Sequence, residues 1–149
     1  MNPVRQSLLA SGLTALATAA TLGLAPGAAV AAPAASPTIS VNWFGSADAR
    51  AHTATVGGRF GCGAERGLAY IEVHLDQRVR RGSVTGFGFG VIGACTDDRT
   101  AGTWTATIPA DQGRFRPGPA TTTARLVVEP NSLTETTEPV RLRPRCARP

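Results

Sequence analysis

The sequence predicts an all-β fold, namely an antiparallel β-sandwich with immunoglobulin-like architecture, six to seven strands and one internal disulfide. Apolar and polar residues alternate with a period of two over most of the chain after residue 37, as they do in half-buried strands. Turn residues separate these runs at intervals of roughly 8–14 residues, a spacing typical of sandwich domains. No segment after residue 37 places apolar residues at helical spacing over three turns. A small barrel is the alternative that this pattern leaves open.

The expected strands follow one another along the chain, and clusters of Gly, Pro, Asp and Ser end each of them. They cover residues 39–43, 54–62, 70–80, 83–95, 103–108, 121–129 and 140–143. The third is the most clearly amphipathic, because Ile71, Val73 and Leu75 alternate with polar or charged residues. The last is short, since only Val140 and Leu142 alternate with arginines.

The strand at 83–95 is unusual because its two faces differ in bulk. One face carries Thr85, Phe87, Phe89, Val91, Gly93 and Cys95. The opposite face is almost bare backbone, with glycine at positions 86, 88 and 90. Glycines within a strand mark a bulge or a close approach, and two interpretations follow. Either a neighbouring loop or aromatic ring lies flat on the glycines, or the glycines form a groove that faces a ligand or partner.

The first 31 residues are typical of a signal peptide. The chain starts with a positively charged segment up to Arg5, and residues 8–24 carry no charge. Ala29-Val30-Ala31 then supplies the small residues that a signal peptidase accepts. We therefore expect a secreted protein with no membrane span after cleavage. Residues 32–37 form a linker in this interpretation, 38–143 the β domain and 144–149 a basic, flexible tail.

Three cysteines remain in the exported chain. Cys62 and Cys95 both fall at the inward parity of their strands and near strand ends, so we expect a disulfide between them. In the chain-entropy model, closing a loop of this length stabilises the fold by roughly 3–4 kcal/mol. Cys146 is left over in the basic tail, as a free thiol or as one half of an intermolecular disulfide.

The residues that could support catalysis do not form a recognisable constellation. Glu72, His74 and Asp76 project from one face of a strand at a spacing of about 6.6–6.8 Å, which is too wide for convergence on one metal ion. A solvated polar face with cross-strand charge pairs is the simpler interpretation. The chain has no Gly-x-Ser-x-Gly motif, and no phosphate-binding helix is expected after the glycine-rich strand. We expect no catalytic centre, no metal and no cofactor.

All fifteen basic residues are arginine, and the formal net charge is +5. The arginine preference has two interpretations, a surface of guanidinium forks that bind carboxylate or phosphate and, as the simpler one, a genome rich in G and C. The modest excess of positive charge predicts weak attraction to polyanions. Arg78 and Arg80, next to Arg81, cluster at one strand end and are candidate partner-facing residues, together with Gly86, Gly88 and Gly90. Aromatic residues for base stacking are nearly missing from outward positions, which argues against a nucleic-acid partner.

These observations favour a non-catalytic secreted module that binds another secreted protein or an anionic component of the cell envelope. The alternative is a small-molecule carrier or a weak hydrolase with a pocket beside the glycine-rich strand. An apolar pocket lined by Phe87 or Phe89 would favour a carrier. His74 within hydrogen-bond reach of a Ser or Asp on another strand would favour an enzyme.

Several positions of the chain resemble one family. They are Gly58-x-Phe60-x-Cys62, Gln77, Gly82, Cys95, Trp104 and Phe115-x-x-Gly118-x-Ala120. Over roughly residues 56–128 the chain resembles a group of small secreted actinobacterial proteins known only as a domain of unknown function. The resemblance implies a disulfide-bridged β domain behind a signal peptide and implies no activity. Cys146 and the arginine-rich tail lie outside the matching pattern.

Overall fold

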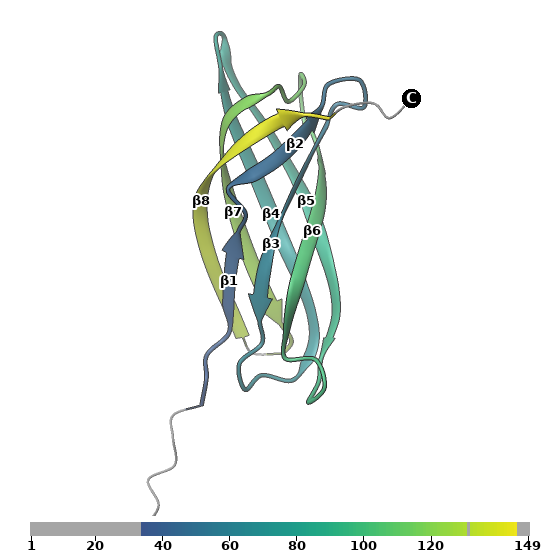
Figure 1. Ribbon diagram of the computed structural model, residues 1–149, viewed down its shortest axis with the longest axis vertical. Helices are drawn as coiled ribbons and strands as arrows, with labels where there is room; N and C mark the ends of the chain where they lie inside the picture. Colours follow the sequence, from purple (N-terminus) through teal and green to yellow (C-terminus); the bar gives the residue numbers. More distant parts are fainter. Residues whose placement is uncertain (1–33, 131, 146–149) are drawn as a thin grey trace, which may run out of the picture. The chain divides into compact units, whose positions relative to one another are not determined.

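A computed structural model describes residues 34–130 and 132–145, and all regular structure in them is β-strand (Figure 1). The strands are β1 (Thr38–Val41), β2 (Phe44–Asp48), β3 (Thr53–Gly61), β4 (Gly67–Val79), β5 (Gly82–Cys95), β6 (Ala101–Pro109), β7 (Gly118–Val128) and β8 (Ser132–Pro144). This confirms the predicted all-β class. The described residues include no helix that is long and apolar enough to cross a membrane. The predicted signal peptide at 1–31 and Cys146 lie outside the described residues.

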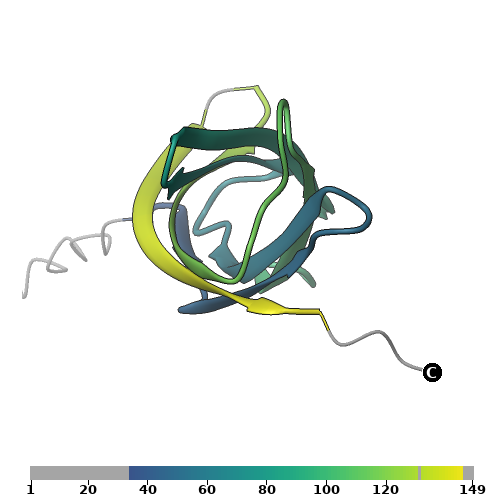
Figure 2. The same ribbon diagram turned by 90° about the horizontal axis from the view of Figure 1, so that it is seen from above.

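Hydrogen bonds join the strands into one sheet in the order β1-β3-β2-β8-β7-β4-β5, with β6 paired to the other edge of β3. β1 and β2 follow one another along the same edge of β3, and β2 also pairs with β8 as the only parallel pair among the described strands. The sheet curls until β5 and β6 lie side by side (Figure 2), where a single bridge joins Gly86 to Ala110. The sheet therefore remains open between these strands. It does not confirm the predicted two-sheet sandwich or its immunoglobulin-like architecture.

The core fills the space that the curled sheet encloses. Every second residue of β4 from Ala69 to Gln77 is buried, as its alternating sequence predicts. The largest fully buried side chains are Phe115, Ile71, Leu75, Ile108, Leu126 and Leu142. Burying one such side chain contributes about 1.5–3 kcal/mol. Trp104 is also buried, and its indole N–H donates a hydrogen bond to the carbonyl oxygen of Ser40 at 3.2 Å, which ties β6 to β1.

Two strands differ from the sequence-based expectation. The pattern does not predict β2, because Phe44–Asp48 lacks clear alternation of apolar and polar residues. The pattern also places Trp43 inside the first strand, but it lies in the break before β2 with 64% of its surface exposed. The last strand begins at Ser132 rather than at residue 140. Its first half alternates half-buried Ser or Thr with exposed residues, so it has strand geometry without an apolar face.

The glycine face of β5 points into the core, and the bulky face points outward. Gly86, Gly88 and Gly90 are buried, whereas Phe89 and Val91 are 54% and 86% exposed. A Cβ atom on Gly86 would lie 2.2 Å from the carbonyl oxygen of Pro109 and 3.1 Å from the ring of Phe115; on Gly88 it would lie 2.8 Å from the carbonyl oxygen of Thr107. The backbone of β6 therefore covers these glycines. The prediction that they face a partner is wrong, because β6 occupies the space in front of them.

The predicted Cys62–Cys95 disulfide is present, with the two Cα atoms 6.1 Å apart. A β-bulge brings Cys95 to the inward side. Tyr70 pairs with Val91 but Ala69 pairs with Gly93, so one extra residue enters β5 and reverses the alternation. Gly93 has φ of 99°, a conformation that glycine adopts without steric cost. Cys95 is thus buried although Phe89 and Val91, which share its sequence parity, face outward.

Candidate anion-binding site

The two ends of the described sheet differ in charge, and Leu75, near the middle of β4, divides them. The arginine end contains the tip of the β4–β5 hairpin, the loop after β6 and the β2–β3 turn; the disulfide end contains Cys62 and Cys95 (Figure 1). Nine arginines and four acids belong to the arginine end, a net charge of +5: Arg50, Arg78, Arg80, Arg81, Arg114, Arg116, Arg141, Arg143 and Arg145 against Asp48, Asp76, Asp111 and Glu138. Four arginines and six acids belong to the disulfide end, a net charge of −2: Arg59, Arg66, Arg99 and Arg125 against Glu65, Glu72, Asp97, Asp98, Glu129 and Glu135.

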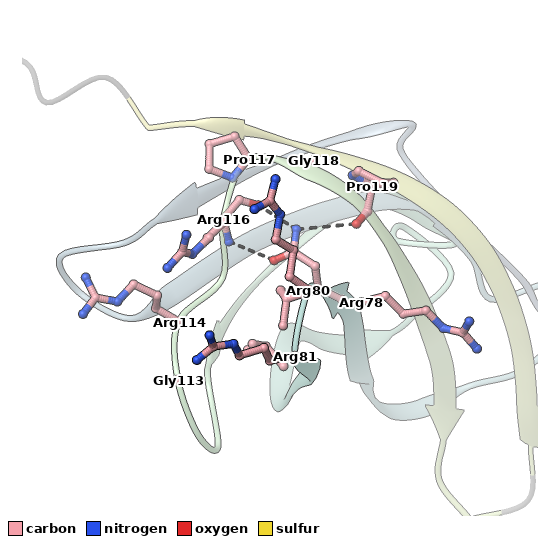
Figure 3. Close-up of a pocket in the computed structure, with 12 residues that line it drawn as sticks. Arg78, Arg80, Arg81, Gly113, Arg114, Arg116, Pro117, Gly118 and Pro119 are labelled. Carbon is pink, nitrogen blue, oxygen red and sulfur yellow. Dashed lines mark hydrogen bonds between the residues drawn. The ribbon is translucent and has the colours of Figure 1, made fainter.

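A hollow of about 530 Å³ opens at the arginine end, and we call it the arginine hollow (Figure 3). Five arginines from two separate segments line it: Arg78, Arg80, Arg81, Arg114 and Arg116. Val79, Val84, Pro117 and Pro119 supply apolar surface between them. The hollow therefore combines several cationic groups with a lining whose exposed surface is more apolar than polar.

The β4–β5 hairpin positions the first three arginines. Val79 pairs with Gly82, so Arg80 and Arg81 are the two residues of a tight turn. Gly82 has φ of 120°, which a residue with a side chain rarely adopts. Arg78 faces outward at the end of β4, where the alternation of the strand places it. The hairpin sequence thus brings three guanidinium groups to one tip.

The side chain of Gln77 positions the other two arginines. Gln77 is 3% exposed. Its amide nitrogen donates to the carbonyl oxygen of Arg116 at 2.7 Å, and its amide oxygen accepts from the backbone N–H of Arg116 at 2.8 Å. Buried polar groups need such partners, so this pair of hydrogen bonds fixes the loop beside the hairpin. Phe115 is fully buried between the exposed Arg114 and Arg116, and anchors the loop from the core side.

Negative charge is missing from the lining of the arginine hollow. None of its lining residues is acidic, and in the described part of the chain none of its five arginines forms an ion pair with a carboxylate. Guanidinium groups are planar forks that bind phosphate, sulfate or carboxylate with two parallel hydrogen bonds. The hollow is therefore suited to a ligand that carries more than one anionic group.

The remaining candidate residues lie elsewhere. Arg78 and Arg80 line the arginine hollow, whereas Gly86, Gly88 and Gly90 lie in the core. The polar face of β4 contains the cross-strand pair expected there, because Arg125 Nη1 lies 3.4 Å from Glu72 Oε2. The described residues contain no group of three His, Cys, Asp or Glu side chains that could hold a metal ion.

The sequence pattern reveals half of this site. Arg78, Arg80 and Arg81 are close in the sequence, so their clustering is visible there. Arg114 and Arg116 reach them through long-range contacts, the hydrogen bonds of Gln77 with Arg116, 39 positions away, and the burial of Phe115. The alternation Arg114-Phe115-Arg116 is the signal that could have identified them. An apolar residue anchored in the core between two arginines turns both arginines outward.

Comparison of the chain with protein-family models, with curated proteins and with solved structures finds no match. The geometry of the site must therefore support any functional proposal.

Proposed function

We propose that this protein is a secreted, non-catalytic β module that binds an anionic polymer of the cell envelope through the arginine hollow. The observation that carries this proposal is that five arginines, none of them in an ion pair within the described residues, line one hollow that has no acidic residue. Like charges repel each other, so this clustering opposes folding, and a bound polyanion would offset the repulsion. A polymer matches better than a small anion, because four further arginines extend the positive charge at the same end.

Other ligand classes have less support. No aromatic side chain lines the arginine hollow, so bases of a nucleic acid would find no stacking partner there. Phe87 and Phe89 line neither the arginine hollow nor the smaller hollow described below, so neither of these two hollows is the phenylalanine-lined pocket that would favour a carrier. In the described residues, no hydrogen bond joins His74 to a Ser or Asp, so a hydrolase has no supporting contact either.

Export and family membership are parts of the same proposal. The leader-like residues 1–31 support secretion, and a disulfide is compatible with an oxidising compartment. The resemblance to small secreted actinobacterial proteins supports the same location. The predicted β-sandwich with immunoglobulin-like architecture remains a prediction, because the strands form a single sheet.

Binding of the secreted protein to polyphosphate across a series of salt concentrations tests the arginine hollow. Each guanidinium–phosphate contact releases counterions, so the logarithm of the binding constant should fall with the logarithm of salt concentration with a slope of about −3.5 to −4.5 if all five arginines take part. Retention on purified cell-wall material at low salt, and elution at high salt, tests the same contact with the natural polymer. Absence of binding to both at low salt would contradict the proposal.

Two matched single variants separate a site from a general effect of net charge. Arg80→Gln removes an arginine from the hollow, and Arg59→Gln removes an exposed arginine from β3 at the disulfide end. We expect Arg80→Gln to reduce the slope by about 0.7–0.9 and Arg59→Gln to leave it unchanged. Equal effects of the two variants would mean that net charge alone causes binding.

A further inference from the structure

The outward face of β5, β4, β7 and β8 has side chains arranged in rows, because cross-strand pairing brings them into register. One row contains Phe87, His74, Thr123 and Thr137, and the next row toward the arginine end contains Thr85, Asp76, Thr121 and Pro139. The rings of His74 and Phe87 have centroids 4.7 Å apart, and Phe87 and Phe89 are also 4.7 Å apart. An aromatic surface thus borders a row of hydroxyl and carboxylate groups.

A second hollow, of about 250 Å³, lies on these two rows, and we call it the outer hollow. Its polar lining consists of His74, Asp76, Thr85, Asp111, Thr121 and Thr123. The hydroxyl group of Thr85 donates to Asp111 Oδ2 at 3.0 Å, so the loop after β6 closes one side of the hollow. No arginine lines it, although the described chain is rich in arginine.

We infer that the outer hollow binds a sugar ring, and that the anionic polymer of the proposed function is therefore a charged glycan. Sugar hydroxyls both donate and accept hydrogen bonds. The Thr121 hydroxyl can do both, and the two carboxylates accept. The Thr85 hydroxyl donates to Asp111 and can accept from a sugar, and the Thr123 hydroxyl shares a hydrogen bond of 3.0 Å with that of Thr137. The C–H groups of a sugar ring can pack against His74, whose ring lies beside that of Phe87 outside the hollow. The volume is just below the range of about 300–1,000 Å³ for pockets of drug-sized ligands, so it suits one ring.

The charges of the outer hollow select among ligand classes. Asp76 and Asp111 repel anionic groups, so the phosphates or sulfates of a polymer would not enter it. A cationic side chain would be attracted by the carboxylates, but it would offer no acceptor for the hydroxyl hydrogen of Thr121. An uncharged polyol satisfies donors and acceptors together.

The arginine hollow and the outer hollow are neighbours, so one polymer could occupy both. The inference that this polymer is a charged glycan rests on the proposed function. Three elements pass directly from one to the other: Asp76 precedes Gln77 and Arg78 on β4, Val84 precedes Thr85 on β5, and Asp111 precedes Gly113 in the loop. Residues two apart on one strand face are separated by about 7 Å. A sugar ring in the outer hollow would thus place a charged substituent or the next unit of the chain beside Arg78.

The test compares ligands that carry the sugar and the charge separately. Polyphosphate has charge without sugar, dextran sulfate has both, and chitotetraose, mannotetraose and short dextran have sugar without charge. We expect at least one neutral oligosaccharide, at millimolar concentration, to shift the backbone amide resonances of Thr85, Thr121 and Thr123 in the ¹⁵N-labelled full chain. The double variant Thr85→Val/Thr121→Val should weaken that binding about two- to tenfold for each hydroxyl removed. Thr105→Val, an exposed threonine of β6 outside the hollow, is the matched control and should change nothing.

The outcomes separate this inference from the proposed function. If the threonine double variant weakens dextran sulfate binding but not polyphosphate binding, while Arg80→Gln weakens both, the charged-glycan ligand is supported. If no neutral oligosaccharide shifts these amides, or if a tetra-arginine peptide shifts them and no sugar does, the sugar site is wrong even though polyphosphate still binds. If a neutral sugar binds and neither polyanion does, the sugar site stands and the proposed function fails.

Discussion

The same long strands run through the arginine end and the disulfide end of this sheet, but the two ends differ in charge balance and in how they are held together. At the disulfide end a covalent bond joins Cys62 to Cys95, and the acids and arginines nearly balance, with ion pairs such as Arg66–Asp97 at 2.8 Å. At the arginine end, the arginines of the hollow form no such pairs in the described chain, and hydrogen bonds from one buried glutamine hold the loop. The comparison shows that positive charge is left unbalanced at the end that contains the arginine hollow, while the cross-link is placed at the opposite end.

Loss of the disulfide should have the largest effect on stability. We expect Cys62→Ser/Cys95→Ser to lower the free energy of unfolding by about 3–4 kcal/mol, because the unfolded chain regains the entropy of a loop between residues 33 positions apart. Urea denaturation measures this change. Since the bridge is at the opposite end, variant protein that is still folded should bind polyphosphate as the wild type does, and a weakened salt slope would contradict this separation.

Replacement of Gln77 by Leu should affect the arginine end alone. The variant leaves the backbone N–H and carbonyl of Arg116 without their buried partner, which costs about 1–3 kcal/mol. Release of the loop should also weaken polyphosphate binding, because Arg114 and Arg116 would no longer be held beside the hairpin. The measurements are urea denaturation and the salt series. Unchanged binding in a destabilised Gln77→Leu protein would show that the loop arginines do not take part.

The glycines of β5 provide a graded comparison along the same strand. The nearest β6 carbonyl oxygen would lie 2.2 Å from a Cβ on Gly86, 2.8 Å from one on Gly88 and 3.4 Å from one on Gly90, so β6 lies closest to β5 at the arginine end. We expect Gly86→Ala to cost about 1–3 kcal/mol through overpacking, because the obstacle is backbone. Gly90→Ala meets ordinary contact distances and should cost clearly less. Thermal denaturation that ranks the two variants the other way would contradict this description of the β5–β6 contact.

The smallest effect concerns Asp48 in the β2–β3 turn. The N–H groups of Ala51 and Arg50 each donate to Asp48 Oδ1 at 3.0 Å, and the bond from Ala51 is the main reason that the pKa of Asp48 lies below its usual value of 3.8. A lowered pKa means that the ionised group stabilises the fold fully above pH 3.8 and that this contribution disappears as the pH falls through the lowered pKa. Asp48→Ala should therefore lower stability slightly at neutral pH and not in strong acid. Asp98→Ala, in an exposed turn at the disulfide end, is the control for urea denaturation at both pH values.

The alternation of apolar residues was sufficient to predict β3, β4, β6 and β7, because one face of each is buried in the core. It could not predict the orientation of β5. Large residues normally face the core, and only the close approach of the β6 backbone explains why glycines do so here. The position of Cys95 was predicted correctly, but for the wrong reason. It is the bulge opposite Ala69 and Tyr70, invisible to a strict period of two, that turns it inward.

The candidate site was predictable only where it is local in sequence. The arginines of the hairpin are neighbours in the chain, whereas those of the loop are brought in by Gln77 from 37 to 39 residues away. The outer hollow likewise depends on Asp111, whose contact with Thr85 spans 26 residues. Strand periodicity contains no information on such contacts, because they depend on how the sheet curls.

The hydrogen bonds between Gln77 and the backbone of Arg116 would also affect the thermodynamics and kinetics of the proposed binding. They order the loop before any ligand arrives, so association does not have to pay the conformational entropy of arranging it. Binding should then proceed without a slow rearrangement step, at a rate set by electrostatic attraction of the polyanion toward the positive end of the molecule. The long arginine side chains would still adjust, which would allow the same preorganised backbone to follow the irregular spacing of charges along the proposed polymer.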